Sequence, residues 1–174
     1  MTHLRLAFLL GLLCLNAAQA QDWRETKWPF PRDAWPAGQA FLCRDQSCSG
    51  HEIIMARVKF GFCNCESGVR DDAEVDYVAD VDLISQEFVP LAKGRNIEIF
   101  GLRGRARAYH YMSGTGPSVA LGIALSRKCD VVAISVSGLR SDGDAQNMID
   151  RIGHSSELMR YLAKSLGELL PDTR

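Results

Sequence analysis

The chain has 174 residues, enough for one ordinary domain with a substantial apolar core. It carries 20 lysine and arginine residues against 21 aspartate and glutamate residues, and 47% of its residues are hydrophobic. This near balance of charge argues against nucleic acid or an anionic membrane surface as a bulk partner, because both attract strongly basic proteins.

The first twenty residues have the pattern of a cleavable signal peptide. Arg5 supplies the positive start, Leu6–Leu15 is almost entirely apolar, and Ala18 and Ala20 are the small residues of a signal-peptidase site. The apolar run covers about 10 residues, whereas a membrane-spanning helix needs roughly 20. We therefore expect cleavage after Ala20, a periplasmic or secreted protein, and no transmembrane segment in the mature chain. Since the removed segment holds one basic and no acidic residue, cleavage changes the net charge from −1 to −2.

Five of the six cysteines follow the predicted cleavage site. Cysteines pair by default in an oxidising compartment, and an odd number leaves at least one free, bound to another chain or acting as a ligand. Cys43 and Cys48 flank a short polar loop, so we expect them to pair with each other. Cys129 would form a long-range bridge with Cys63 or Cys65, and the sequence leaves this choice open.

Residues 21–42 are expected to form an irregular, extended arm ahead of a single α+β domain at 43–174. Tryptophans alternate with prolines here, and proline removes a backbone donor and favours extended backbone. The tryptophans either cover the surface of the domain or form a docking arm for a partner or a sugar. In the second interpretation Trp28 and Trp35 are candidate binding residues.

The first part of the domain predicts a strand, a helix and a second strand. Apolar residues alternate with a mixed face over 51–62, the pattern of a strand. Residues 71–88 begin with acidic residues and have helical spacing of apolar residues, so we predict a helix, although they also alternate. A strand is predicted over 95–112, bent at Gly101 and Gly104.

The second part predicts a hairpin and a long helix. Residues 119–136 alternate and then become β-branched, with a turn at 126–130. An amphipathic helix follows from Ser141 and ends before Pro171. The predicted fold is therefore α+β in the order β-α-β-β-β-α, a mainly antiparallel sheet of about four strands with two helices packed on it.

The predicted strand 95–112 has one face that alternates basic and aromatic side chains. Three guanidinium groups on one side of a strand repel one another unless acids or an anionic ligand offset them. They either pair with the acidic segment 71–82 or bind an anionic ligand or partner, with the tyrosines adding flat contact area. The candidate binding residues on this face are Arg103, Arg105, Arg107, Tyr109 and Tyr111.

An alternative hypothesis is a metal site. Cys63 and Cys65 are two residues apart, so in extended backbone both sulfurs point the same way and suit a soft metal ion. His51 and Met55, earlier on the same predicted strand, are residue types that bind copper. A second cluster with diagnostic spacing is missing, however, and oxidation to disulfides competes. We therefore expect no cofactor, with copper or another soft metal as the alternative.

The sequence holds no complete catalytic or cofactor motif. The glycine-rich stretch Ser113–Pro117 lacks the lysine of a phosphate loop. The sequence thus favours a non-enzymatic accessory or binding protein of the periplasm, whose partner is a periplasmic protein or a small anionic ligand. Two alternatives remain: a copper-type or thiol-redox protein using Cys63 and Cys65, and a small hydrolase whose site assembles only in three dimensions.

Overall fold

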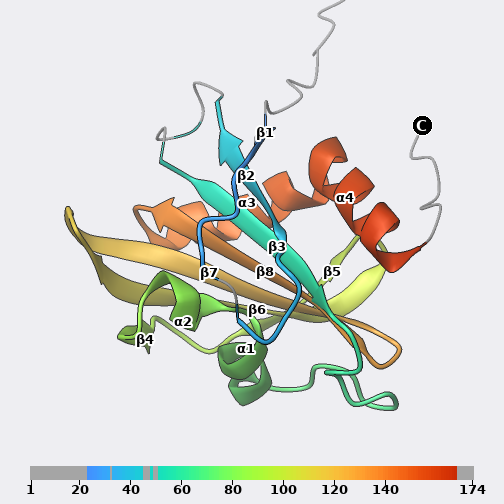
Figure 1. Cartoon of the computed structure of the whole chain (residues 1–174). Coiled ribbons are helices and arrows are strands. Elements are labelled where there is room, and N and C mark those ends of the chain that lie inside the picture. Colours follow the sequence, from blue (N-terminus) through green and yellow to red (C-terminus); the bar gives the residue numbers. More distant parts are fainter. Residues whose placement is uncertain (1–22, 32, 45–47, 49–50, 168–174) are drawn as a thin grey trace, which may run out of the picture.

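The computed structural model describes residues 23–31, 33–44, 48 and 51–167, so the predicted signal peptide lies outside the described residues. Their strands form one sheet in the order β1-β2-β3-β8-β7-β6-β4, with β5 also paired to β6, and every pairing is antiparallel (Figure 1). The strands are β1 (Trp23–Thr26), β2 (Gln39–Cys43), β3 (Ile53–Lys59), β4 (Phe88–Pro90), β5 (Arg95–Ile99), β6 (Leu102–Ser113), β7 (Gly116–Arg127) and β8 (Asp130–Leu139). The helices are α1 (Asp72–Val78), α2 (Val81–Ile84), α3 (Asp142–Gly153) and α4 (Ser156–Leu166).

The expectation of about four strands and two helices is wrong. The described residues form eight strands and four helices, and the sheet is the dominant element. The predicted strand 51–62 corresponds to β3, and the predicted hairpin 119–136 lies within the longer hairpin of β7 and β8. The additional elements arise at four places, each with a local cause.

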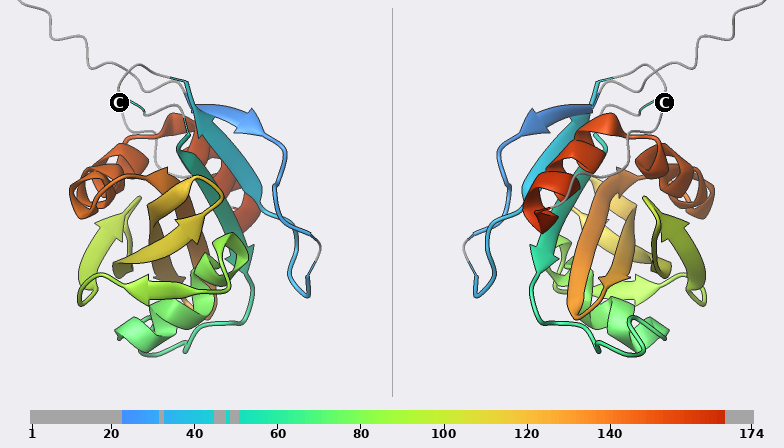
Figure 2. Two further views of the ribbon diagram at one scale, coloured as in Figure 1. Left: turned by 90° about the vertical axis from the view of Figure 1, so that its left-hand side faces the viewer. Right: turned by 90° about the vertical axis from the view of Figure 1, so that its right-hand side faces the viewer.

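Strands form at both ends of the tryptophan- and proline-rich segment, which was expected to be irregular and extended throughout. β1 pairs with β2, from Trp23 opposite Cys43 to Thr26 opposite Ala40, and β2 joins this ribbon to β3. The prolines all lie in the connection between the two strands, where a missing N–H group removes no ladder hydrogen bond. That connection lies at the outer side of the sheet beside β3 (Figure 2).

Residues 95–112 form a hairpin instead of one bent strand. β5 and β6 meet at Phe100 and Gly101, whose φ angles of 53° and 73° are both left-handed. Two consecutive residues with positive φ are typical of a type I′ hairpin turn. Phenylalanine rarely adopts this conformation, so the sequence gives only the glycine as a signal.

The predicted helix 71–88 divides into α1, α2 and the short strand β4. Its start is as expected, because Asp71 and Glu74 form a capping box. The helix breaks at Asp80, which has a left-handed φ of 58° and a buried side chain. The tertiary contacts of the Asp80 side chain therefore end the helix here, although the spacing of the apolar residues favours a longer one.

The predicted C-terminal helix is also two helices. α3 ends at Gly153, and the Ser155 hydroxyl then accepts a hydrogen bond from the backbone N–H of Leu158 as the N-cap of α4. Of the helices in the described part of the chain, none combines the length and apolar character needed to cross a membrane.

Each face of the sheet carries its own apolar core, with α3 and α4 on one side and α1 and α2 on the other (Figure 2). The first core packs Met148, Ile152 and Leu162 against strand residues such as Ile123 and Ile134. This larger core holds the two C-terminal helices on the sheet.

The second core places the α1–α2 segment close to the sheet. Val75 and Val81 pack there with Tyr109 of β6. Gly122 allows the close approach, because a Cβ at this position would lie 2.8 Å from Val81 Cγ2 and 3.0 Å from Ala79 Cβ. The face that carries the predicted basic and aromatic residues is thus covered in part by α1 and α2.

The described residues contain two disulfides. Cys43–Cys48 is confirmed as predicted, and Cys65–Cys129 answers the choice that the sequence left open. Cys63 is the free cysteine of the described part of the chain.

Candidate functional site: an aromatic surface over a buried charge network

The middle of the predicted basic and aromatic face of β6 is not a free surface. Arg105 is 8% exposed and Tyr109 is fully buried, and Arg107 lies against α1. The side chain of Arg103 is 89% exposed, and Tyr111 is half-buried. Because α1 covers the middle of this face, the five residues do not form one continuous surface for a partner.

The covered residues pair with the acidic helix α1. Arg105 donates from Nε to Asp72 Oδ1 at 3.1 Å. Arg107 Nη1 lies 2.7 Å from Asp76 Oδ2, and the Tyr109 hydroxyl donates to Asp76 Oδ1 at 2.6 Å. In the middle part of this face, the arginines therefore pair with acids of the same protein, which was the first of the two interpretations.

A second set of buried charges lies on β3. Arg57 donates to both carboxylate oxygens of Asp80 at 2.6 Å, and its Nη1 donates to Asp33 Oδ1 at 2.9 Å. Lys59 Nζ lies 2.7 Å from Asp80 Oδ1 and 2.9 Å from the carbonyl oxygen of Val78. Arg57, Lys59 and Asp80 are 2%, 3% and 4% exposed, which is tolerable only because they are paired.

Burial and hydrogen bonds shift the pKa values of Asp72, Asp33 and Tyr109 in these two sets of residues. Burial acts to raise the pKa of Asp72, but the hydrogen bonds from Arg105 and the Gly94 N–H, together with the charges of Arg105 and Arg107, lower this pKa overall. The hydrogen bond from Arg57 lowers the pKa of Asp33. Burial, together with the hydrogen bond to Asp76, raises the pKa of Tyr109, so this hydroxyl stays neutral and donates. The result is a fixed arrangement of opposite charges between the sheet, α1 and the β1–β2 connection.

Aromatic side chains from three segments meet above Lys59. Trp35 of the β1–β2 connection packs edge-on against Phe62, with ring centroids 4.7 Å apart. Phe62 stacks on Tyr77 of α1 at 5.4 Å. Lys59 Nζ lies 5.8 Å from the centroid of Trp35 and 5.5 Å from that of Phe62. Tyr77 is nevertheless 73% exposed, so this cluster is open to solvent.

Two further aromatic residues, Trp28 and Phe60, lie along or beside the β1–β2 connection. The guanidinium carbon of Arg57 lies 5.7 Å from the centroid of Trp28. Phe60, at the end of β3, is 55% exposed and lines a cavity of about 250 Å³ together with Pro36 and Tyr161 of α4. We call the set Trp28, Trp35, Phe60, Phe62 and Tyr77 the aromatic surface.

The structure thus brings the two predicted arm residues, Trp28 and Trp35, onto the cations of β3. The predicted binding residues did not include Phe60, Phe62 or Tyr77. Tyr77 had a usable signal, since it lies two residues after the apolar Val75 and faces away from the apolar stripe of its helix.

The residues of the alternative metal hypothesis are not gathered. Cys65 is bonded to Cys129, and Cys63 Sγ lies 3.7 Å from the hydroxyl of Ser126. Met55 is buried within β3, and His51 is exposed at its other end, a strand length of about 20 Å from the cysteines. A soft-metal site at Cys63 stays a prediction, and Cys65 joins it only after reduction of its disulfide.

Comparison with known proteins gives no family assignment, since no protein-family model and no curated protein matches the chain. The fold is similar to the solution structure of cyanobacterial PsbP (CyanoP) from Synechocystis sp. PCC 6803, with a TM-score of 0.48 and 12% identity over 76% of this chain and 79% of that chain. A Pseudomonas aeruginosa protein of unknown function matches with a TM-score of 0.33 and 18% identity over 91% and 89% of the two chains. Likeness at this level carries no information on activity or partners.

Proposed function

We propose that this protein is an exported, non-catalytic binding protein that docks an apolar segment of a partner protein on the aromatic surface. The observation that supports the proposal is the exposure of two aromatic side chains: Tyr77, 73% exposed and stacked on Phe62, and Phe60, 55% exposed beside a cavity that Tyr161 also lines. Exposed groups of large apolar side chains are uncommon on monomers unless they bind something, and aromatic residues are enriched at interfaces. The predicted signal peptide and the two disulfides support export.

The charges beneath the aromatic surface support a preorganised binding site. Asp33 belongs to the β1–β2 connection, and its ion pair with Arg57 anchors that connection on β3. Trp28 and Trp35 are held on either side of this anchor by their contacts with Arg57 and Lys59. A surface that is already ordered loses less conformational freedom when a partner binds.

A protein segment fits this surface better than a sugar. Sugar recognition needs free hydrogen-bonding groups beside the aromatic rings, but Lys59 and Arg57 are already engaged by Asp80. The cavity beside Phe60, about 250 Å³ in volume, has room for one apolar side chain. We therefore expect the partner to contribute an apolar anchor residue at this point.

Photo-crosslinking tests this proposal in cells that export the protein. A photoreactive phenylalanine analogue in place of Tyr77 is expected to give a discrete adduct with one partner protein. The control is the same analogue at Val89 of β4, which is 66% exposed and lies outside the aromatic surface. Phe60→Ser is expected to reduce the adduct from position 77 by about tenfold, as the loss of an anchor residue does. Equal adducts from positions 77 and 89, or an unchanged yield in the Phe60→Ser protein, would contradict the proposal.

A second candidate function, binding of a small anion, concerns Arg103. This residue lines a cavity of about 660 Å³ together with Arg70 and Lys128, and with the acids Glu66 and Glu98. The pair of Arg103 with Glu98 spans 3.6 Å between side chains that are 89% and 60% exposed. Such exposed pairs contribute little, so an anionic ligand can recruit the guanidinium.

Calorimetric titration with inorganic phosphate and with citrate checks the anion site. We expect the double variant Arg103→Gln and Lys128→Gln to bind about tenfold more weakly than the wild type, because each removed cation loses a charge-assisted hydrogen bond. Arg160→Gln is the matched control, since this exposed arginine of α4 lies outside the cavity. No detectable binding of either anion by the wild type at millimolar concentration would rule the site out.

A further inference from the structure

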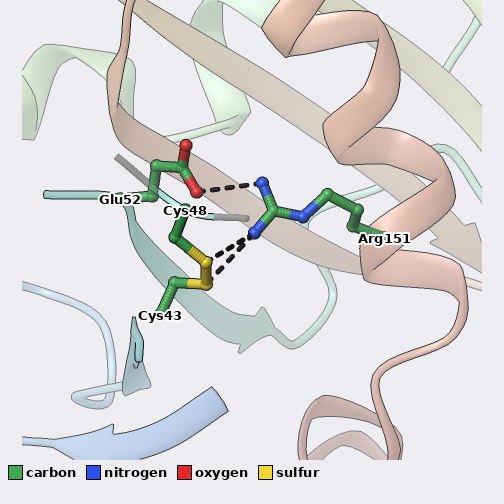
Figure 3. The surroundings of a disulfide bond; sticks show 4 residues. All are labelled: Cys43, Cys48, Glu52 and Arg151. Atoms are coloured by element: carbon green, nitrogen blue, oxygen red, sulfur yellow. Dashed lines mark hydrogen bonds and ion pairs between the residues drawn. A yellow bond between two sulfur atoms is a disulfide. The ribbon is translucent and has the colours of Figure 1, made fainter. Parts of the chain in front are cut away.

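The disulfide Cys43–Cys48 has a charged neighbour that its structural role does not require. The guanidinium of Arg151, from α3, faces both this disulfide and Glu52 (Figure 3). Its Nη2 lies 3.1 Å from Cys43 Sγ and 2.9 Å from Cys48 Sγ, and its Nη1 donates to Glu52 Oε2 at 2.9 Å. The Trp23 ring covers the guanidinium at 5.2 Å from its centroid.

The sulfur atoms of a disulfide are weak acceptors for such a cation. The side chain of Arg151 is only 16% exposed, so the guanidinium has given up most of its contact with water. Its buried Nε has no hydrogen-bond partner among the residues that the structure describes. A thiolate is a far stronger acceptor than a neutral sulfur, because a hydrogen bond between two charged groups is shorter and stronger. The surroundings of Nη2 therefore suit a reduced, anionic sulfur better than the disulfide.

We propose that Cys43–Cys48 is a redox-active disulfide that exchanges electrons with the dithiol of a partner protein, and that Arg151 stabilises the thiolate produced. Cys48 is the more accessible sulfur, since Cys43 is 2% exposed and Cys48 is half-buried. The site lies at the Ile53 end of β3, whereas Lys59 and the aromatic surface lie at the other end, so the inference is independent of the proposed function.

The exchange follows the chemistry of thiols and disulfides. A thiolate of the partner attacks Cys48 Sγ, which forms a mixed disulfide and breaks the Cys43–Cys48 bond. The electron pair of that bond remains on Cys43 as a thiolate next to Arg151 Nη2. The second thiol of the partner then attacks the partner's own sulfur and releases Cys48. The partner leaves as a disulfide, and two electrons have passed to the two cysteines. Cys48 takes up one of the two protons of the partner dithiol, and the other is released to solvent because Cys43 remains a thiolate.

The same groups also resemble a metal site, but the charge of Arg151 argues against it. One donor atom from each of Cys43, Cys48 and Glu52 lies within 4.8 Å of the others. A metal cation would lie in direct contact with a guanidinium, and the repulsion would oppose binding. The negative charge of Glu52 would repel a thiolate, but the ion pair of Glu52 with Arg151 offsets that charge. Arg151 therefore selects electron exchange over metal binding.

Equilibration of the signal-free chain in dithiothreitol redox buffers tests the proposal. Differential alkylation and peptide mass spectrometry then follow each disulfide separately, so Cys65–Cys129 is an internal reference. We expect Cys43–Cys48 to open under less reducing conditions than Cys65–Cys129. In Arg151→Met the equilibrium constant of Cys43–Cys48 should shift about tenfold towards the disulfide, the effect of one lost charge-assisted hydrogen bond.

Two further variants separate the charge of Arg151 from a general loss of structure. Arg160→Met removes an exposed arginine from α4 and should leave both disulfide equilibria unchanged. Arg151→Lys keeps the charge with fewer donors, so its equilibrium should lie between those of the wild type and Arg151→Met. The proposal is overturned if Cys65–Cys129 opens first, or if Arg151→Met and Arg151→Lys both leave the Cys43–Cys48 equilibrium at its wild-type value.

Discussion

Replacing Cys65 and Cys129 together with alanine is expected to lower the free energy of unfolding by about 4 kcal/mol. This disulfide joins the segment after β3 to the turn between β7 and β8, across a sequence separation of 64 residues. A cross-link over such a distance removes much of the conformational freedom of the unfolded chain, and this effect grows with the length of the closed loop. Urea unfolding of the oxidised wild type and of the double variant measures the difference.

The other disulfide provides the matched comparison. Cys43 and Cys48 are five residues apart, so closing their loop should contribute only about 2 kcal/mol. Replacing both with alanine should therefore destabilise the protein less than the loss of Cys65–Cys129. If the two double variants unfold at the same urea concentration, loop length does not determine how these bridges stabilise the fold.

The sequence predicted an element correctly where the local pattern and the tertiary contacts favour the same structure. The alternation in β3, the hairpin of β7 and β8 and the acidic cap at Asp71 are local signals, and each corresponds to an element of the structure. The pairing of Cys43 with Cys48 was also local, because the two residues flank one short loop. In these cases no distant contact changes what the neighbouring residues favour.

Elements that depend on distant partners were missed. β1 and β2 are short and interrupted by a proline-rich connection, and they exist as strands because each pairs with another strand. Asp80 breaks the predicted helix because its carboxylate is held by Arg57, which lies 23 residues earlier in the chain. The spacing of the apolar residues over 71–88 gives no indication of this ion pair with Arg57.

The candidate site was predictable only in part for the same reason. Trp28 and Trp35 stand out in the sequence, but their position over Arg57 and Lys59 depends on the pairing of β2 with β3. The predicted outer face of β3 was expected to be mixed, yet Arg57 and Lys59 are almost fully buried. Alternation identifies the two faces of a strand, but it does not reveal that a second layer covers the polar one.

Asp80→Asn should lower the free energy of unfolding by about 3 kcal/mol, the other large effect that we expect. The variant leaves Arg57 and Lys59 buried, with Asp33 as the remaining carboxylate partner of Arg57. Asparagine is the suitable replacement because it has the shape of aspartate and tolerates the left-handed φ of 58°. The loss in urea unfolding can therefore be assigned to the charge and not to the backbone.

Asp82→Asn is the control for this prediction. Asp82 lies two residues later, in the first turn of α2, and it is exposed. Its replacement removes the same charge from the protein, but a surface change of this kind should stay within about 0.5 kcal/mol of the wild type. Equal stabilities of the two variants would mean that the buried pairs only offset the cost of removing their charges from water. The fixed position of the β1–β2 connection would then have to come from the packing of Trp28 and Trp35 alone.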